Sequence, residues 1–323
     1  MGDRFGRCDS GGIDCGNLVG LTVSALLPID WGELSPLRLK SQLVAEELFA
    51  GRHRSTRRGA GVEFGGHRPY VPGDDLRFLD RRSLLRHDRL MIRQFETDTD
   101  RALYLCLDAS ASMAVRGDKA PGAKLAYAAL IAAALTRVAI AGQDPVGLSW
   151  LSAGARPVLR AQSGRAAFER IVQRLETAEA VEPLQGDATA FDASVAALAH
   201  QARRGSIVVV LSDLLDLPTT AATSLAGLAL APRALVLVQV LDPSERDLSF
   251  SGKLRLRGVE SKAMVETDAD VVRATYKERL GEHVAKWRRA IEQRGGRLVC
   301  AASDDSPVGV LRDVVEAIGQ VRR

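Results

Sequence analysis

An aspartate and two serines follow one strongly apolar segment of the sequence at alternate positions. Asp108, Ser110 and Ser112 lie in the stretch LDASASM, directly after the apolar run ALYLCL. Carboxylate and hydroxyl oxygens are hard ligands, and hard oxygens suit Mg²⁺, Mn²⁺ or Ca²⁺. The pattern therefore indicates a divalent cation site, with Mg²⁺ as the expected ion and Mn²⁺ or Ca²⁺ as alternatives.

Two further segments supply oxygen groups of the same kind. Ser212 and Asp213 end the apolar run IVVVL, and Asp187 and Thr189 precede a predicted helix. An aspartate at a strand end often only caps the next turn or helix, so each group alone also has a structural explanation. The three segments together favour one shared site, because ligands of open parallel sheets bind beyond the carboxyl ends of the strands.

A cation held by two hydroxyls, with carboxylates contacting it directly or through water, keeps a coordination position open. A carboxylate from another protein could complete that shell, so the chemistry favours a binding site and no enzymatic activity. A metal-dependent phosphoester hydrolase is the alternative. It needs a general base, and the chain has few histidines. The sequence contains neither a G-x-S-x-G elbow nor a Walker lysine loop.

The segments that must position these groups alternate between strands and helices from Arg101 onward. Continuous apolar runs of strand length are typical of parallel strands buried on both faces. Short connections to helical segments predict a doubly wound, mostly parallel α/β sheet flanked by helices. The expected strands are 102–108, 144–152, 155–160, 206–213, 233–242 and 297–303. The expected helices are 122–142, 164–179, 190–205, 223–231, 270–294 and one from Pro307.

Composition divides the chain of 323 residues into three parts. We expect residues 1–34 to be a disordered N-terminal segment. Residues 35–100 are predicted to form an arginine- and glycine-rich module of a helix, short strands and loops, too short for a core of its own. Residues 101–323 form the α/β domain, with a hairpin excursion near 250–267.

Net charge, cysteine content and hydropathy indicate where in the cell the protein is expected. The net charge of +4 and the pI of about 9.0 permit an anionic partner without requiring one. The four cysteines fit no metal-ligand spacing and suggest a reducing compartment. The apolar stretch LVGLTVSALL is about half the ~20 residues that a spanning helix needs. We therefore expect a cytoplasmic protein without a membrane segment.

The stretch LDASASM resembles the D-x-S-x-S motif of von Willebrand factor type A domains, where it forms the metal-ion-dependent adhesion site. The order of strands and helices from Arg101 onward resembles theirs too. The resemblance implies a von Willebrand A-like fold. It also implies metal-site roles for the matching residues Asp108, Ser110, Ser112, Thr189 and Asp213.

The upstream stretch GRHRSTRRGAGVEFGGHRPYVPGDDLRFLD is similar to the signature of domain-of-unknown-function family 58. Those bacterial proteins join such a module to a von Willebrand A-like domain. The family usually has Asp-Trp where Asp80 is followed by Arg81. The resemblance implies a non-enzymatic adaptor that works with a MoxR-type AAA+ ATPase in chaperone-like or maturation systems. A client protein that offers a carboxylate would be the second partner.

The arginine-rich module mixes charges of both signs. Interleaved arginines and aspartates favour internal ion pairs, because the guanidinium fork matches a carboxylate in two-point geometry. A docking surface for an acidic partner is the second interpretation. Nucleic-acid binding is the third, because stacking aromatics are few and no nucleic-acid motif is present. The residues expected to have a partner-binding or structural role are Arg68, Tyr70, Gly73, Asp74, Asp75, Arg77 and Asp80.

Overall fold

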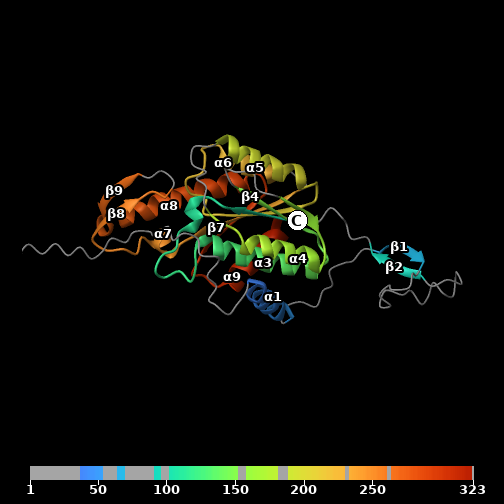
Figure 1. Ribbon diagram of the computed structural model, residues 1–323. Coiled ribbons are helices and arrows are strands. Elements are labelled where there is room, and N and C mark those ends of the chain that lie inside the picture. Colours follow the sequence, from blue (N-terminus) through green and yellow to red (C-terminus); the bar gives the residue numbers. More distant parts are fainter. Residues whose placement is uncertain are drawn as a thin grey trace, which may run out of the picture.

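The main body of the protein is a six-stranded sheet with helices on both faces (Figure 1). The computed structural model describes residues 37–53, 64–69, 91–95, 102–151, 158–180, 188–229, 233–259 and 263–321. The strand order is β10-β7-β6-β3-β4-β5, and all neighbours are parallel except β4 and β5, which are antiparallel. The prediction of a mostly parallel, doubly wound α/β sheet is confirmed.

The strands of this sheet are short, and the four central ones are buried, as their continuous apolar runs predict. Their bounds are β3 Leu103–Asp108, β4 Val146–Leu151, β5 Leu159–Gln162, β6 Ile207–Ser212, β7 Ala234–Leu241 and β10 Arg297–Ala302. Every residue of β3, β4, β6 and β7 is buried. These four central strands therefore fix the position of whatever follows their carboxyl ends.

Two apolar cores lie on opposite faces of the sheet, because successive side chains of a strand point to opposite sides. Leu103, Leu105 and Leu107 of β3 belong to one core, and Tyr104 and Cys106 belong to the other. The first core is covered by α1 Leu37–His53, α3 Lys124–Ala141, α4 Arg165–Glu176 and α9 Pro307–Val321. The second is covered by α5 Ala188–Gln201, α6 Ala221–Ala226, the 3₁₀ turn η3 Gly227–Ala229 and α8 Ala269–Glu292.

Helix α1 is part of this layered body (Figure 1). Leu37 and Leu48 lie in the same core as the apolar side chains of α3, although the sequence groups this helix with the arginine-rich module. Helix α3 is the one helix of the described chain that is long and apolar enough to cross a membrane. It is 78% buried inside the molecule, which is the situation of a core helix.

The arginine-rich module is described only in part. Strand β1 Phe64–Pro69 pairs antiparallel with β2 Met91–Phe95, a strand that the sequence reasoning did not predict. Arg68 lies in β1 opposite Ile92. The other module residues singled out from the sequence lie outside the described residues: Tyr70, Gly73, Asp74, Asp75, Arg77 and Asp80.

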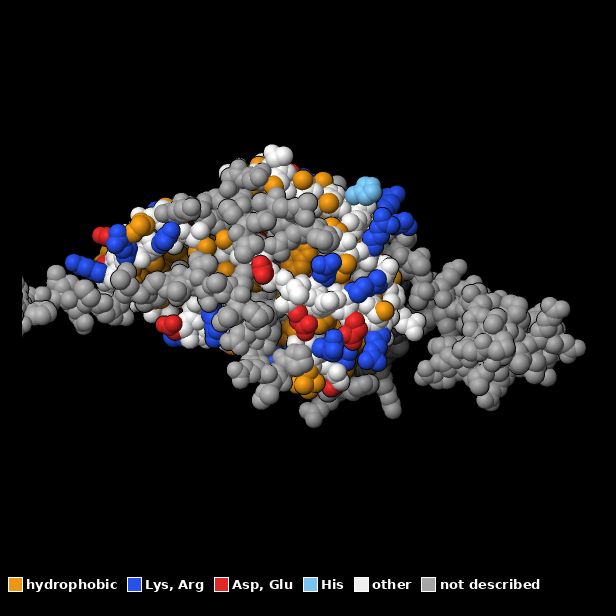
Figure 2. All heavy atoms as spheres, viewed as in Figure 1, with side chains coloured by type: hydrophobic (Ala, Val, Ile, Leu, Met, Phe, Trp, Pro, Cys, Tyr) orange, Lys and Arg blue, Asp and Glu red, His pale blue; other side chains and the backbone are white. Residues whose placement is uncertain are grey.

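A hairpin of β8 Lys253–Arg257 and β9 Met264–Asp268 occupies the stretch where the sequence places an excursion. The short helix α7 Pro243–Asp247 precedes it and was not predicted. Figure 2 shows Lys and Arg side chains beside apolar ones at this end of the molecule. Met264 and Val265 are about half exposed there, at 51% and 55%. The hairpin is thus an amphipathic projection next to the carboxyl edge of the sheet.

Candidate functional site

The carboxyl ends of β3 and β6 meet at one edge of the sheet, and Asp108 and Ser212 are their last residues. The strand order reverses between them, because β4 and β5 lie on one side of this pair and β7 and β10 on the other. Ligands of open α/β sheets bind at such a point. The fold therefore brings the residues of the first and second predicted segments together.

Asp108 is held by hydrogen bonds to both of its carboxylate oxygens. Oδ1 accepts the backbone N–H of Ser110 at 2.8 Å, and Oδ2 accepts the hydroxyl of Ser212 at 2.5 Å. Burial and the charge of Asp213 raise the pKa of Asp108 to about 7, against the lowering effect of these hydrogen bonds. A carboxylate whose ionisation is this unfavourable would be stabilised by a nearby cation.

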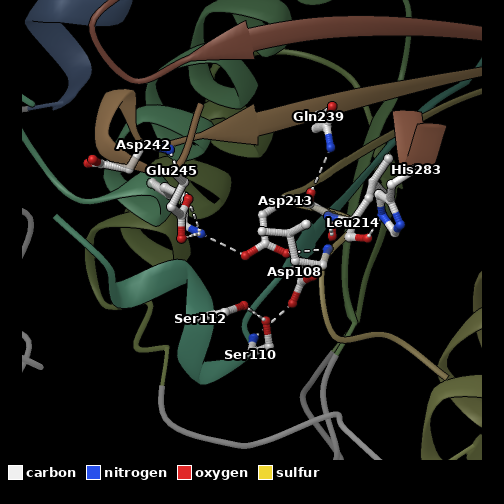
Figure 3. Close-up of polar contacts among 12 residues, drawn as sticks. Asp108, Ser110, Ser112, Asp213, Leu214, Gln239, Asp242, Glu245 and His283 are labelled. Atoms are coloured by element: carbon white, nitrogen blue, oxygen red, sulfur yellow. Dashed lines mark hydrogen bonds and ion pairs between the residues drawn. The ribbon is translucent and has the colours of Figure 1, made fainter. Parts of the chain in front are cut away.

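The hydroxyls of Ser110 and Ser112 face each other at the start of the 3₁₀ helix η2 Ala111–Ala114 (Figure 3). Their Oγ atoms lie 3.0 Å apart, and both side chains are buried. Two oxygens that bind one Mg²⁺ at a right angle, each at about 2.1 Å, are also separated by about 3.0 Å. Ca²⁺ has longer bonds but takes about 6–8 oxygens, so neighbouring oxygens around it can lie equally close. The pair, which is hydrogen-bonded in this structure, therefore fits a hard divalent ion.

A metal ion at this place would be bound by more hydroxyls than carboxylates. Among the described residues, no group of three or more His, Cys, Asp and Glu side chains could hold a metal ion. The donor set that fits is Asp108 with Ser110 and Ser112. One charged and two neutral ligands would leave a bound divalent ion with net positive charge.

Asp213 lies beside this set, but its own oxygens are already engaged (Figure 3). Oδ1 accepts the backbone N–H of Leu215 at 3.0 Å, and Oδ2 accepts Nζ of Lys124 at 2.7 Å. The side chain amide of Gln239 donates to the Asp213 carbonyl at 3.1 Å. The next residue, Leu214, has a left-handed backbone with φ of 58°. Asp213 is therefore held in place by Lys124, Leu215 and Gln239.

The sequence reasoning missed Lys124, the first residue of α3. Its side chain is fully buried and donates to Asp213 and to both oxygens of Glu245, at 2.8 Å each. Burial lowers the pKa of Lys124, but the charges of Asp213 and Glu245 outweigh this effect and raise the pKa above its ordinary value. A lysine at a helix N-terminus is unfavourable beside the positive end of the helix dipole. A lysine at this position of a predicted helix therefore indicates that a buried or nearby carboxylate compensates its charge.

Glu245 reaches Lys124 because α7 is fixed at the end of β7. Asp242 caps this helix by accepting from the backbone N–H of Ser244, and Glu245 in turn accepts the N–H of Asp242. Oδ2 of Asp242 also accepts the backbone N–H of Gly117 at 2.7 Å. The segment between Gly117 and Lys124 is thus attached to α7 at both of its ends.

Thr189 makes no hydrogen bond to the residues of this cluster. Thr189 is the second residue of α5 and is exposed, and no hydrogen bond joins it to Asp108, Ser110, Ser112 or Asp213. Asp187, which precedes it, lies outside the described residues. The contacts of the described residues therefore join the β3 and β6 ends, and a role for Thr189 in the site stays a prediction.

Known proteins resemble this chain in sequence and in fold. A sequence model of the family described as protein of unknown function DUF58 matches residues 66–286. Uncharacterized proteins of Mycobacterium tuberculosis and Mycobacterium bovis are each 28% identical over 293 residues. The match covers 90% of this chain and 89% of theirs.

Solved structures with von Willebrand A domains also match. A von Willebrand factor type A protein from Catenulispora acidiphila has a TM-score of 0.40 at 11% identity, covering 72% of this chain and 44% of its own. An aerotolerance-related membrane protein from Bacteroides fragilis has a TM-score of 0.46 at 15% identity, covering 68% of this chain and 98% of its own.

The localisation predicted from the sequence needs a correction. Besides the Bacteroides fragilis protein, an uncharacterized membrane spanning protein from Vibrio fischeri matches at 15% identity. Its TM-score is 0.24, and the match covers 68% of this chain and 98% of its own. The names of these proteins refer to membranes, and on this comparison the cytoplasmic prediction is wrong. Cysteine spacing does not report on membrane association, and a short apolar stretch argues only against a spanning helix within that stretch.

Proposed function

The chain belongs to the DUF58 family of proteins of unknown function, and we propose that its von Willebrand A-like domain is a metal-ion-dependent protein-interaction domain. The fold and the family suggest protein interaction in general. The dependence on a metal ion is the finer part of the proposal. It is supported above all by the convergence of the Ser110 and Ser112 hydroxyls, which are hydrogen-bonded to each other, beside the buried Asp108.

Asp108, Ser110 and Ser112 would hold the ion at the carboxyl edge of the sheet. When bound, the ion supplies a positive centre that attracts and orients an anionic group of another protein. The residues of this chain have three tasks. Asp108 provides the charged ligand, the two serines provide neutral ones, and Ser212 keeps Asp108 in its rotamer through the hydrogen bond to Oδ2.

Binding accounts for this site better than hydrolysis does. A hydrolase needs a general base within reach of the reacting group. His283 is placed behind the Asp213 loop, where its Nε2 lies 2.8 Å from the Leu214 carbonyl and 3.0 Å from the indole nitrogen of Trp287. Nε2 can donate to the carbonyl or accept from the indole N–H, but not both at once, and either bond joins the ring to the fold.

The proposed ligand is a carboxylate on a client protein, because a hard divalent ion with one charged protein ligand attracts a second hard, anionic oxygen. A MoxR-type AAA+ ATPase is the proposed working partner, and the support for it is the family resemblance. In this proposal the domain binds the client protein, and the ATPase provides the energy of ATP hydrolysis for its maturation.

The experiment measures the melting temperature (Tm) of the full chain with Mg²⁺ and with EDTA. We expect Mg²⁺ to raise the Tm of the wild type, since an ion that binds the folded state alone stabilises it. Asp108→Asn and Ser110→Ala should remove this response, whereas Ser163→Ala, at an exposed serine outside the site, should keep it. Binding of the purified MoxR-type ATPase is then measured with Mg²⁺ and EDTA. If the affinity for the ATPase is changed neither by EDTA nor by Asp108→Asn, the metal dependence is overturned.

A further inference from the structure

We infer that Lys124 is a positioning residue that holds Asp213 away from the ion, so that the position Asp213 could fill is left to the partner's carboxylate. The inference rests on the proposed function and concerns the same site. It arises from an arrangement that the motif does not predict, a fully buried ammonium in direct contact with the second aspartate.

The donors of Lys124 are all used within the protein, and both oxygens of Asp213 accept hydrogen bonds. Lys124 has three N–H donors, and it makes three hydrogen bonds, one to Asp213 and two to Glu245. Each oxygen of Asp213 also has a donor, from Lys124 and from the Leu215 backbone. Among the described residues Asp108 has no ion pair, so Asp213, whose charge is shared with Lys124, is the weaker ligand of the two. With this ion pair intact, we expect Asp213 to act through a water molecule.

Lys124 has little freedom to release Asp213. Its backbone N–H donates to the carbonyl of Val115, and its side chain is enclosed at 0% exposure. Glu245 is fixed by the capping box of α7, and Tyr276 of α8 donates to the Glu245 carbonyl. The ammonium is thus anchored from three elements, α3, β6 and α7.

The charges explain what this arrangement would achieve. Lys124 neutralises one of the two carboxylates that contact it, and among the described residues it is the one cation in ion-pair contact with either Asp213 or Glu245. Asp108 is then the one carboxylate in the donor set that fits the ion. An ion with a single anionic protein ligand retains more positive charge for the partner's carboxylate than an ion with two. Lys124 would therefore favour coordination of the ion by the partner's carboxylate over coordination by Asp213.

The test is a double-mutant cycle with Mn²⁺ alone as the probe, on the full chain. Affinity is measured for the wild type, Lys124→Met, Asp213→Asn and the double variant. We expect Lys124→Met to bind Mn²⁺ about tenfold more tightly, in the range typical of second-shell changes. We also expect Asp213→Asn to weaken binding at least about tenfold more in the Lys124→Met background than in the wild type.

A second readout separates direct ligation from a general charge effect. Relaxation of water protons by bound Mn²⁺ reports the number of water ligands, and it should fall when Lys124→Met lets Asp213 displace a water. If Lys124→Met does not fold, the inference is tested with single variants of the wild type. There Asp108→Asn should weaken Mn²⁺ binding much more than Asp213→Asn, and equal losses would overturn the inference.

The possible failures are distinguishable. If the wild type binds no Mn²⁺ but Lys124→Met does, the proposed metal dependence fails and the role of Lys124 is supported. If the wild type binds Mn²⁺ and the cycle shows no coupling, the metal dependence survives and the role of Lys124 is overturned. Absence of Mn²⁺ binding in both proteins overturns both.

Discussion

Ser212 and Asp108 are joined across the carboxyl ends of β6 and β3 by a hydrogen bond of 2.5 Å. The two residues are 104 positions apart in the sequence. The bond stabilises the ionised carboxylate, yet the pKa of Asp108 is still raised to about 7, because burial and the charge of Asp213 outweigh it. Without a cation, this site is a source of instability at neutral pH.

The first prediction is a fall in stability between about pH 4 and pH 7 in the presence of EDTA. The unfolded aspartate has a pKa of about 4, whereas Asp108 in the folded protein has a pKa of about 7. Between these values the folded state holds a proton that the unfolded state has lost, so stability decreases as pH rises. We expect the Tm to fall by several degrees over this window, measured by circular dichroism.

The variant Asp108→Asn is the control for this pH dependence. It keeps the shape of the side chain and removes its titration, so its Tm should vary less between pH 4 and pH 7. Some slope should remain, because burial also raises the pKa of Glu245 and Asp216. Identical slopes for the two proteins would contradict the role assigned to Asp108.

The second prediction concerns the choice of ion. Asp108, Ser110 and Ser112 offer only three side chains, which suits Mg²⁺ because it usually keeps several waters, whereas Ca²⁺ takes about 6–8 oxygen ligands. Mg²⁺ and Mn²⁺ should therefore raise the Tm more than Ca²⁺ at equal concentration. The measurement is a thermal-shift titration with each chloride salt. A larger response to Ca²⁺ would show that more oxygen ligands surround the ion than these three side chains provide.

The third prediction separates Thr189 from the site. Its exposed position on α5, without a hydrogen bond to the cluster, implies that Thr189→Ala leaves the Tm response to Mg²⁺ unchanged. Ser112→Ala should reduce that response, since it removes one of the two buried hydroxyls. If Thr189→Ala weakens the response as much as Ser112→Ala does, then α5 must approach β3 when the ion binds.

The sequence was informative where the pattern is local. Asp108, Ser110 and Ser112 are spaced by two residues after an apolar strand, so one short stretch reveals both the strand and the polar groups that follow it. Asp213 was found for the same reason, directly after β6, another apolar run that pairs with β3. The parallel sheet then brings these groups to one edge, which follows from the fold class alone.

The remaining part of the site depends on contacts between distant segments. Lys124 meets Asp213 across 89 positions and Glu245 across 121, and no short-range pattern encodes such a pairing. Helix α7 has a full set of local signals, with Asp242 at the N-cap, Pro243 at the first position and Glu245 at the third. It was missed because five residues are too few to show a helical apolar period.

The last prediction tests the attachment of the loop after Ser112 to α7. A Cβ at Gly117 would lie 2.4 Å from Oδ1 of Asp242, so Gly117→Ala must push the loop away from the helix. Overpacking of this kind costs about 1–3 kcal/mol, and we expect the Tm to fall by several degrees. Gly281→Ala, in open space on α8, should instead stabilise the protein by up to about 1 kcal/mol. Equal melting temperatures for the two variants would mean that the loop is not held by Asp242.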